Sequence, residues 1–234
     1  MAERRFNWWE SVFFAALVLV AAFILIRSSL FEVRQVTVRG NALLPARQVV
    51  EASGITLGTN IFRVQLAEAQ ARLKGLALVK EARLSRDLPG TVVIEITERR
   101  PVALINIRGR YWSVAEDGVP LREESLGARA LPLITGVAPE GPGLGRVLKI
   151  VAAFPGQAVA ELSEINLRPD RCLVAYTLEG IEVRLGTAEK PWAQGSMLLS
   201  ILHAVRREGR PVTYIDLSDP EKAVVMYAEN GLDG

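Results

Sequence analysis

The sequence has few of the residues on which enzyme chemistry most often depends. Its 234 residues include one cysteine, Cys172, and one histidine, His203. A single cysteine excludes an intrachain disulfide and a redox cysteine pair, and a single histidine excludes the histidine-rich metal signatures. The nucleophile motif Gly-x-Ser-x-Gly is also missing. We therefore expect a protein that is not an enzyme and that holds no metal and no cofactor.

The few residues that could act as catalytic groups or metal ligands have simpler structural interpretations. His203 lies near the edge of the apolar stripe of an expected helix, which favours a partly exposed surface histidine. Cys172 lies in an apolar segment, so we expect a small buried side chain and not a reactive thiol. Asp216 and Asp219 could form a carboxylate pair. The simpler interpretation is that Asp216 is a polar residue of a strand and that Asp219 forms a turn before Pro220.

Charge and loop patterns also exclude two classes of ligand. The net charge of +2 is too balanced to indicate a nucleic-acid partner. The glycine-rich segment Pro139–Gly145 has neither dinucleotide-binding nor Walker spacing, so we expect a flexible loop there. No small-molecule substrate is indicated.

One long apolar run lies near the N-terminus. Val12–Ile26 contains no charged residue and is about 22 Å long as a helix, short of the roughly 30 Å of a bilayer core. Its flanks, Ser11 and residues 27–31, would extend the helix to about 31 Å. Trp8 and Trp9 lie where an aromatic belt belongs. The pattern predicts a transmembrane helix over residues 11–30, with the lipid bilayer as its surroundings.

A cleaved signal peptide is the alternative for this run. Arg4 and Arg5 precede the apolar core, and Val20, Ala21 and Ala22 offer a small-residue cleavage site. We rank it second because cleavage would leave apolar Phe23–Ile26 at the new N-terminus. Arginines lie on both sides of the run, so the positive-inside rule does not predict which end of the helix faces the cytoplasm.

The next segment, residues 31–101, predicts a β-α-α-β-β domain with both helices on one face of the sheet. Pro45 suits the first turn of one helix, and Gly54 and Gly75 lie where the two helices should end. The clearest hairpin has its turn at residues 86–90. The expected strands are residues 33–39, 78–85 and 91–98, and the helices residues 45–53 and 66–74.

Residues 102–228 predict a β-rich domain with helices packed on an antiparallel sheet. Pro191–Glu208 is the longest amphipathic segment outside the apolar run, and Gly209 follows its end. A second helix is expected around residues 147–154, before Pro155-Gly156. The expected strands are residues 103–107, 111–115, 165–167, 172–177, 181–185, 214–217 and 222–228.

Several of these segments carry a resemblance to a known family. Four stretches of the first domain are similar to a POTRA module, a protein-binding module: residues 36–41, 58–62, 86–94 and 98–103. A POTRA module just outside one N-terminal membrane helix resembles the bacterial FtsQ/DivIB cell division family. Three later stretches are similar to the same family: residues 131–136, 183–186 and 214–217.

The resemblance covers essentially the whole chain and implies five regions. They are a cytoplasmic start (1–10), a transmembrane helix (11–30), a POTRA domain (31–101), an FtsQ/DivIB-like β-domain (102–228) and a short C-terminal tail (229–234).

The resemblance also implies a function. It is that of a non-enzymatic scaffold of the cytoplasmic (inner) membrane at the division septum, with its N-terminus cytoplasmic and the bulk of the chain extracytoplasmic. The implied partners are FtsB and FtsL, together with other divisome proteins such as the septal peptidoglycan synthase complex. An alternative is a POTRA-type receptor in protein secretion or outer-membrane assembly, which normally needs a following membrane β-barrel.

The last expected strand is the candidate binding site. At a sheet edge its unpaired N–H and C=O groups would form a template for a partner strand. In FtsQ-like proteins this strand docks FtsB, and Tyr227 lies where relatives carry a large aromatic, a good interface anchor. Ser218 lies where some relatives carry a basic residue. The matching residues are Val224, Val225, Met226 and Tyr227.

Overall fold

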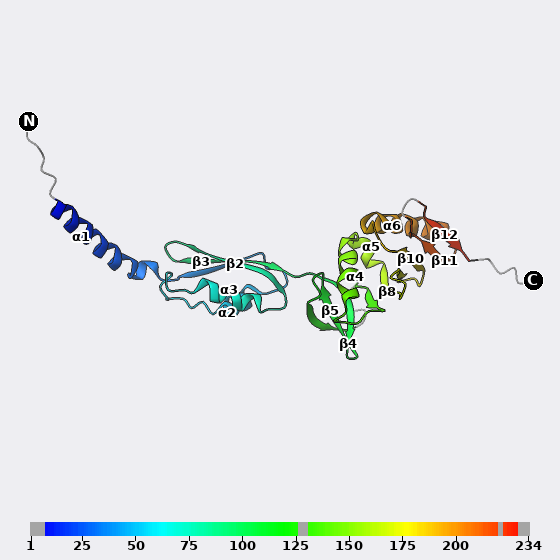
Figure 1. Ribbon diagram of the computed structural model, residues 1–234, viewed down its shortest axis with the longest axis horizontal. Helices are drawn as coiled ribbons and strands as arrows, with labels where there is room; N and C mark the ends of the chain where they lie inside the picture. The colour runs from blue at the N-terminus through cyan, green and yellow to red at the C-terminus, as the bar shows by residue number, and fades with distance from the viewer. Residues whose placement is uncertain (1–7, 126–130, 220–221, 229–234) are drawn as a thin grey trace, which may run out of the picture. The chain divides into compact units, whose positions relative to one another are not determined.

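The computed structural model describes residues 8–125, 131–219 and 222–228 (Figure 1). The chain forms two compact units, residues 1–99 and 100–234. Most of the expected cytoplasmic start (1–10) and all of the expected tail (229–234) lie outside the described residues.

The apolar run forms helix α1 (Trp8–Ile26). The helix ends at Ile26 and does not continue to Leu30 as expected. The reason is Ser28, whose backbone is extended and whose Oγ accepts a hydrogen bond from the Leu30 N–H at 3.3 Å, which begins the short 3₁₀ helix η1 (Ser29–Phe31). A serine that bonds to the nearby backbone in this way competes with continuation of an α-helix.

Across residues 8–125, 131–219 and 222–228, no helix combines the length and the apolar character that crossing a membrane requires. The transmembrane segment expected over residues 11–30 therefore stays a prediction.

The first unit has the predicted β-α-α-β-β order after η1. Strand β1 (Gln35–Arg39) runs parallel to β3 (Thr91–Glu98), which pairs antiparallel with β2 (Val79–Asp87), so the sheet order is β1-β3-β2. Helices α2 (Ala46–Ser53) and α3 (Leu66–Lys74) cover one face (Figure 1). Gly54 ends α2 with a φ of 69°, a conformation that glycine adopts without strain.

The core of the first unit lies between the sheet and these two helices. Val92, Ile94 and Ile96 of β3 point into it and are buried, as their alternation predicts. Val49 of α2 and Leu73 of α3 are fully buried against them. On the other face of β3, Glu95 and Thr97 are exposed and Val93 is buried.

The described residues of the second unit form one nine-stranded sheet in the order β12-β11-β10-β9-β8-β7-β4-β5-β6. Helices α4, α5 and α6 lie on one face of it (Figure 1). The main core fills the space between that face and the helices, with Leu198 and Leu202 of α6 fully buried. The strands are β4 (Pro101–Ile107), β5 (Arg110–Ala115), β6 (Pro120–Glu124), β7 (Leu133–Thr135), β8 (Leu162–Leu167), β9 (Leu173–Thr177), β10 (Glu182–Gly186), β11 (Val212–Asp216) and β12 (Val224–Tyr227). The helices are α4 (Pro142–Ala153), α5 (Gly156–Ala160) and α6 (Pro191–Glu208).

The expected antiparallel sheet is wrong in part, because the sheet is mixed. The pairs β4/β7, β7/β8 and β10/β11 are parallel. Parallel neighbours need a crossover connection, and α6 is the crossover between β10 and β11, while α4 and α5 connect β7 to β8. The pattern of apolar residues does not record strand direction, so the sequence predicted most of these strands but not their orientation.

The flexible loop expected at Pro139–Gly145 is also wrong in its second half, because α4 begins at Pro142. Proline suits the first turn of a helix, since its missing N–H would have no intrahelical partner there. Gly143 is needed for close packing: a Cβ at this position would lie 3.0 Å from Leu167 Cδ2 and 3.2 Å from Val137 Cγ1. Gly143 therefore serves the packing of α4 against the sheet, whereas Gly145 has no atom within 4 Å of the position of a Cβ.

In the first unit, the carboxylate of Glu98 holds the loop between β1 and α2. Its oxygens accept hydrogen bonds from the backbone N–H groups of Ala42, Leu43 and Leu44, at 3.0, 2.7 and 2.8 Å. These are charge-assisted bonds, which are stronger than neutral ones. One side chain at the end of β3 thus satisfies three consecutive backbone donors in the loop.

We expect Glu98→Gln to loosen this loop. The substitution removes the charge and replaces one acceptor by an NH₂ group that opposes a backbone donor, so the free energy of local opening should fall by about 1–3 kcal/mol. Native-state hydrogen exchange of the amides of residues 42–44 measures it. Glu95→Gln is the matched control, because Glu95 lies on the same strand but is exposed. Its Oε1 lies 3.9 Å from Arg39 Nη1. Equal exchange in the two variants would contradict the role of Glu98.

Candidate partner-binding edge

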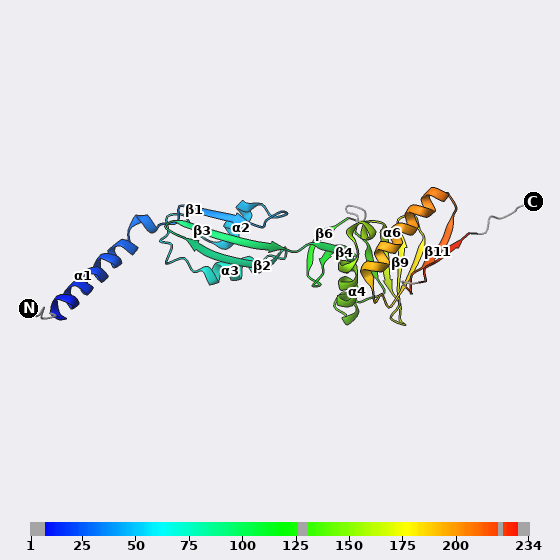
Figure 2. The same cartoon turned by 90° about the horizontal axis from the view of Figure 1, so that it is seen from above.

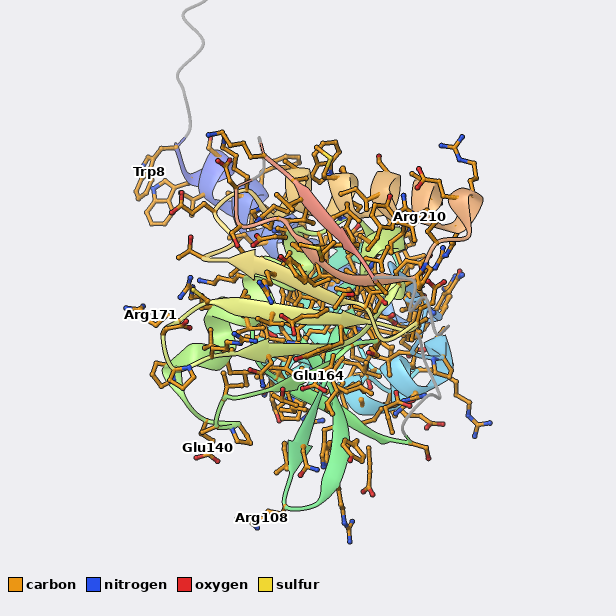
Figure 3. The ribbon with its side chains drawn as sticks, turned by 90° about the vertical axis from the view of Figure 1, so that its right-hand side faces the viewer. Trp8, Arg108, Glu140, Glu164, Arg171 and Arg210 are labelled. Carbon is orange, nitrogen blue, oxygen red and sulfur yellow. The ribbon has the colours of Figure 1, made fainter. Side chains whose placement is uncertain are left out.

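Strand β12 is the outermost strand at one end of the nine-stranded sheet, among the residues that the structure describes. It pairs antiparallel with β11 alone, with Ile215 opposite Val225 and Asp216 opposite Val224. Figure 3 shows this strand at the margin of the sheet, beyond β11. The four residues predicted as the binding site, Val224, Val225, Met226 and Tyr227, are the whole of β12.

The position of β11, and with it that of β12, is held by Gln194 of α6. This buried side chain donates from Nε2 to two backbone carbonyls, Leu185 O at 2.9 Å and Leu217 O at 2.7 Å. Leu185 lies in β10 and Leu217 directly follows β11. One amide group therefore ties the ends of the two parallel strands to the helix that connects them.

The backbone of β12 presents two N–H groups outward. The N–H of Ala228, just after the strand, donates to Pro211 O at 2.9 Å, toward the β11 side. Successive N–H groups of a strand alternate in direction, so those of Met226 and Val224 also point toward β11. Those of Val225 and Tyr227 then point away from the sheet. These outward donors are the groups that a further strand would use.

The side chains of β12 divide between two faces. Val224 and Met226 are 49% and 45% exposed, on the face of the sheet that the helices leave open. Val225 is half-buried and packs against the main core, and Tyr227 is half-buried on the same side. The strand is therefore attached to the domain through one face and presents apolar side chains on the other.

Tyr227 is fixed by two residues at the end of α6. Its hydroxyl donates to Glu208 Oε2 at 2.9 Å, and the guanidinium of Arg210 lies 4.0 Å from the centre of its ring. Figure 3 shows Arg210 beside the C-terminal end of α6. The bond to Glu208 is the main cause that raises the pKa of the Tyr227 phenol; partial desolvation and the charge of Glu208 add to it, and Arg210 opposes it. An aromatic that the sequence suggested as an anchor for a partner thus has an anchoring role within the domain.

The sequence reasoning missed the neighbours of β12 on the open face. Tyr214 lies opposite Met226, and the guanidinium of Arg184 lies 4.0 Å from the centre of the Tyr214 ring. Arg184 also donates to Glu182 Oε1 at 2.9 Å, and this hydrogen bond is the main cause that raises the pKa of Arg184. A signal was present, because Tyr214 and Asp216, and likewise Glu182 and Arg184, are spaced two apart in their strands and so share a face.

Of the residues set aside in the sequence, His203 and Cys172 lie outside this edge, whereas Asp216 lies in β11 opposite Val224. His203 is exposed on α6, as predicted, whereas Cys172 is half-buried just before β9 and not within it, which corrects the expected buried position. Asp216 Oδ1 accepts from the Ser218 N–H at 2.9 Å, and the carbonyl of Asp219 accepts from Lys222, as turn residues do. Within the described part of the chain, no three His, Cys, Asp or Glu side chains gather as metal ligands would.

The raised pKa of Tyr227 leads to a prediction about alkaline pH. Only the neutral phenol can donate to Glu208, so this contribution to the docking of β12 is present below about pH 10 and is lost as the pH rises through the raised pKa. The alkaline ultraviolet difference titration between the chain and Tyr227→Phe should report a phenol with a pKa above its ordinary value. Glu208→Gln should move that titration back toward the ordinary value. An unchanged titration in Glu208→Gln would contradict the assigned cause.

Comparison with known proteins agrees with the two-unit architecture. The family model described as POTRA domain, FtsQ-type, matches residues 31–99, and that described as cell division protein FtsQ/DivIB, C-terminal, matches residues 103–218. The cell division protein FtsQ of Streptomyces bingchenggensis is 26% identical over 86% of this chain and 78% of its own length. The cell division protein DivIB of Geobacillus kaustophilus is 29% identical over 78% of this chain and 70% of its own length.

A solved structure, the major extracytoplasmic domain of DivIB from Geobacillus stearothermophilus in its trans isomer, shares 22% identity. The match covers 47% of this chain and 97% of that one, with a TM-score of 0.38, too low to support a conclusion about the fold. The two family models together span both compact units, and the curated relatives carry the same family names. The chain belongs to the FtsQ/DivIB family of bacterial cell division proteins.

Proposed function

We propose that the chain is a non-enzymatic divisome scaffold that captures a partner by adding one of the partner's strands to β12. The observation that carries the proposal is the free edge of β12, with the N–H groups of Val225 and Tyr227 directed away from the sheet. Backbone pairing of this kind supplies affinity, and alternate side chains supply selectivity. The partners that family membership favours are FtsB and FtsL, which would link the chain to other divisome proteins such as the septal peptidoglycan synthase complex.

The side chains around the edge fit an apolar partner strand. Val224 and Met226 are exposed beside the half-buried Tyr214, which makes a partly apolar strip on the open face next to the free backbone. A strand added to β12 would place alternate side chains over the same face, where burial of apolar area contributes about 25 cal/mol per Å². Tyr227 holds the strand from the other face, so partner binding does not have to order it.

Val225→Pro tests the outward donors. Proline removes the N–H that points away from the sheet and leaves the N–H groups of Val224 and Met226, which point toward β11, in place. We expect the affinity of the full chain in nanodiscs for the extracytoplasmic FtsB–FtsL pair to fall at least about tenfold, because one backbone bond is lost and the ring blocks close approach. Titration calorimetry measures it.

Val225→Ala is the control, since it removes more of the side chain than Val225→Pro does but keeps the N–H. Its affinity should stay close to that of the parent chain. Hydrogen exchange of the amides in β10 and β11 should be unchanged in both variants, which shows that the rest of the sheet remains folded. Equal affinities of Val225→Pro and the parent chain would rule out strand addition at this edge.

We infer that the chain is attached to the cytoplasmic membrane through α1, with residues 1–10 cytoplasmic and the chain from residue 31 onward extracytoplasmic. The support is α1 itself, whose apolar side chains are exposed along the helix; they include Phe13, Phe14, Leu19 and Phe23. Exposed apolar surface of this extent is typical of a segment covered by lipid or by another protein.

Fluorescence imaging of growing cells with a fusion at Met1 tests location and attachment together. We expect a band at midcell during constriction, with the fusion intact and protected from protease added outside the cell. A uniform signal around the envelope would contradict the divisome role. Loss of the fusion by cleavage would contradict the anchor and favour the signal-peptide interpretation.

A further inference from the structure

The end of the first unit at which the chain enters from α1 gathers exposed apolar side chains from three segments. Leu30 belongs to η1, Leu57 and Phe62 to the connection between α2 and α3, and Leu88 to the turn between β2 and β3, and all four are exposed. Strands β1 and β3 both begin at this end (Figure 2). We call these four residues the entry surface.

Backbone hydrogen bonds hold the three segments together. The Val33 N–H donates to Thr59 O and the Gly58 N–H donates to Val33 O, both at 2.8 Å. The Arg34 N–H donates to Gly90 O, also at 2.8 Å. The rings of Phe31 and Phe62 pack with their centres 5.3 Å apart. The entry surface is therefore built on ordered backbone and is not a set of unrelated loop tips.

The charge around the entry surface is positive. Residues 27–34, 55–65 and 86–90 contain four arginines against two carboxylates, a net charge of +2. Arg86 is used within the unit, where it donates to Ile61 O and Val64 O at 2.8 Å. Arg27, Arg34 and Arg63 are exposed. Apolar tips surrounded by arginines are the combination that suits the boundary between acyl chains and anionic headgroups.

From these features we propose that the entry surface docks on the lipid bilayer, with Leu57, Phe62 and Leu88 in the headgroup layer and the arginines on anionic headgroups. The partner is a lipid surface because the chain leads directly from the apolar helix α1 into this end of the unit. This inference rests on the proposed membrane attachment. Docking would hold this domain in one orientation above the membrane, whereas a flexible tether would leave its orientation free.

The test uses the full chain with Cys172→Ser and one new labelling position, either Leu57→Cys or Leu43→Cys. Leu43 is the matched control, because it is also an exposed leucine, 48% against 64% for Leu57, but lies at the opposite end of the unit in the loop held by Glu98. Each variant carries an environment-sensitive fluorophore and is reconstituted into vesicles of phosphatidylcholine with or without phosphatidylglycerol. Lipids with a quencher near the headgroup report contact.

We expect quenching at position 57 and little at position 43, with stronger quenching when phosphatidylglycerol is present. Charge reversal of Arg34 and Arg63 to glutamate should reduce the ratio of docked to free domain in these vesicles by roughly fivefold or more per arginine, and added salt should weaken docking of the parent chain.

The outcomes separate this inference from the membrane attachment on which it rests. A chain that does not float with the vesicles overturns both. A chain that floats but shows equal quenching at positions 57 and 43 overturns the docking surface and leaves the attachment standing.

Discussion

The free edge of the second unit depends on the two hydrogen bonds that Gln194 makes inside the domain. Its Nε2 donates to Leu185 O in β10, which also accepts from the Ala188 N–H at 3.1 Å, and to Leu217 O after β11. A buried carbonyl left without a partner costs about 1–3 kcal/mol. The Oε1 atom of Gln194 has no hydrogen-bond partner among the described residues. The side chain thus donates to two backbone carbonyls while its own acceptor oxygen stays unpaired there. These bonds thereby hold β10, α6 and β11 in fixed positions, and β12 pairs with β11.

The sequence predicted the elements whose signals are local. Helix α6 has the predicted bounds, because Pro191 suits its first turn and Gly209 ends it with a φ of 65°. The β2–β3 hairpin and the two helices of the first unit follow for the same reason. Strand direction, the short strands β6 and β7 and the five-residue helix α5 were not predicted, since these depend on pairing and packing between distant segments. The bond from Gln194 to Leu217 spans 23 residues, and no local pattern announces it.

The same division holds for the candidate site. That β12 exists could be predicted from Val224 to Tyr227, but its place at the margin of the sheet is a matter of topology. Tyr227 stays a predicted partner contact, and the structure adds that its hydroxyl donates to Glu208 and that the Arg210 guanidinium lies over its ring. In a half-buried strand some side chains pack within the domain and others are exposed to a partner, and only the three-dimensional arrangement shows which side chain has which role.

The two margins of the nine-stranded sheet are built differently, and the difference argues for β12 as the functional edge. Strand β6 begins at Pro120, which has no N–H to donate, and continues into Arg122, Glu123 and Glu124. Arg122 pairs with Glu124 at 2.7 Å, and Glu123 with Arg110 at 3.2 Å. Proline and charge at a margin are the usual means by which sheets resist the addition of further strands. Strand β12 has neither, although such an edge exposes the protein to unwanted pairing. Among the described residues, the margin at β12 therefore has none of the features that protect the margin at β6, which fits the proposed addition of a partner strand there.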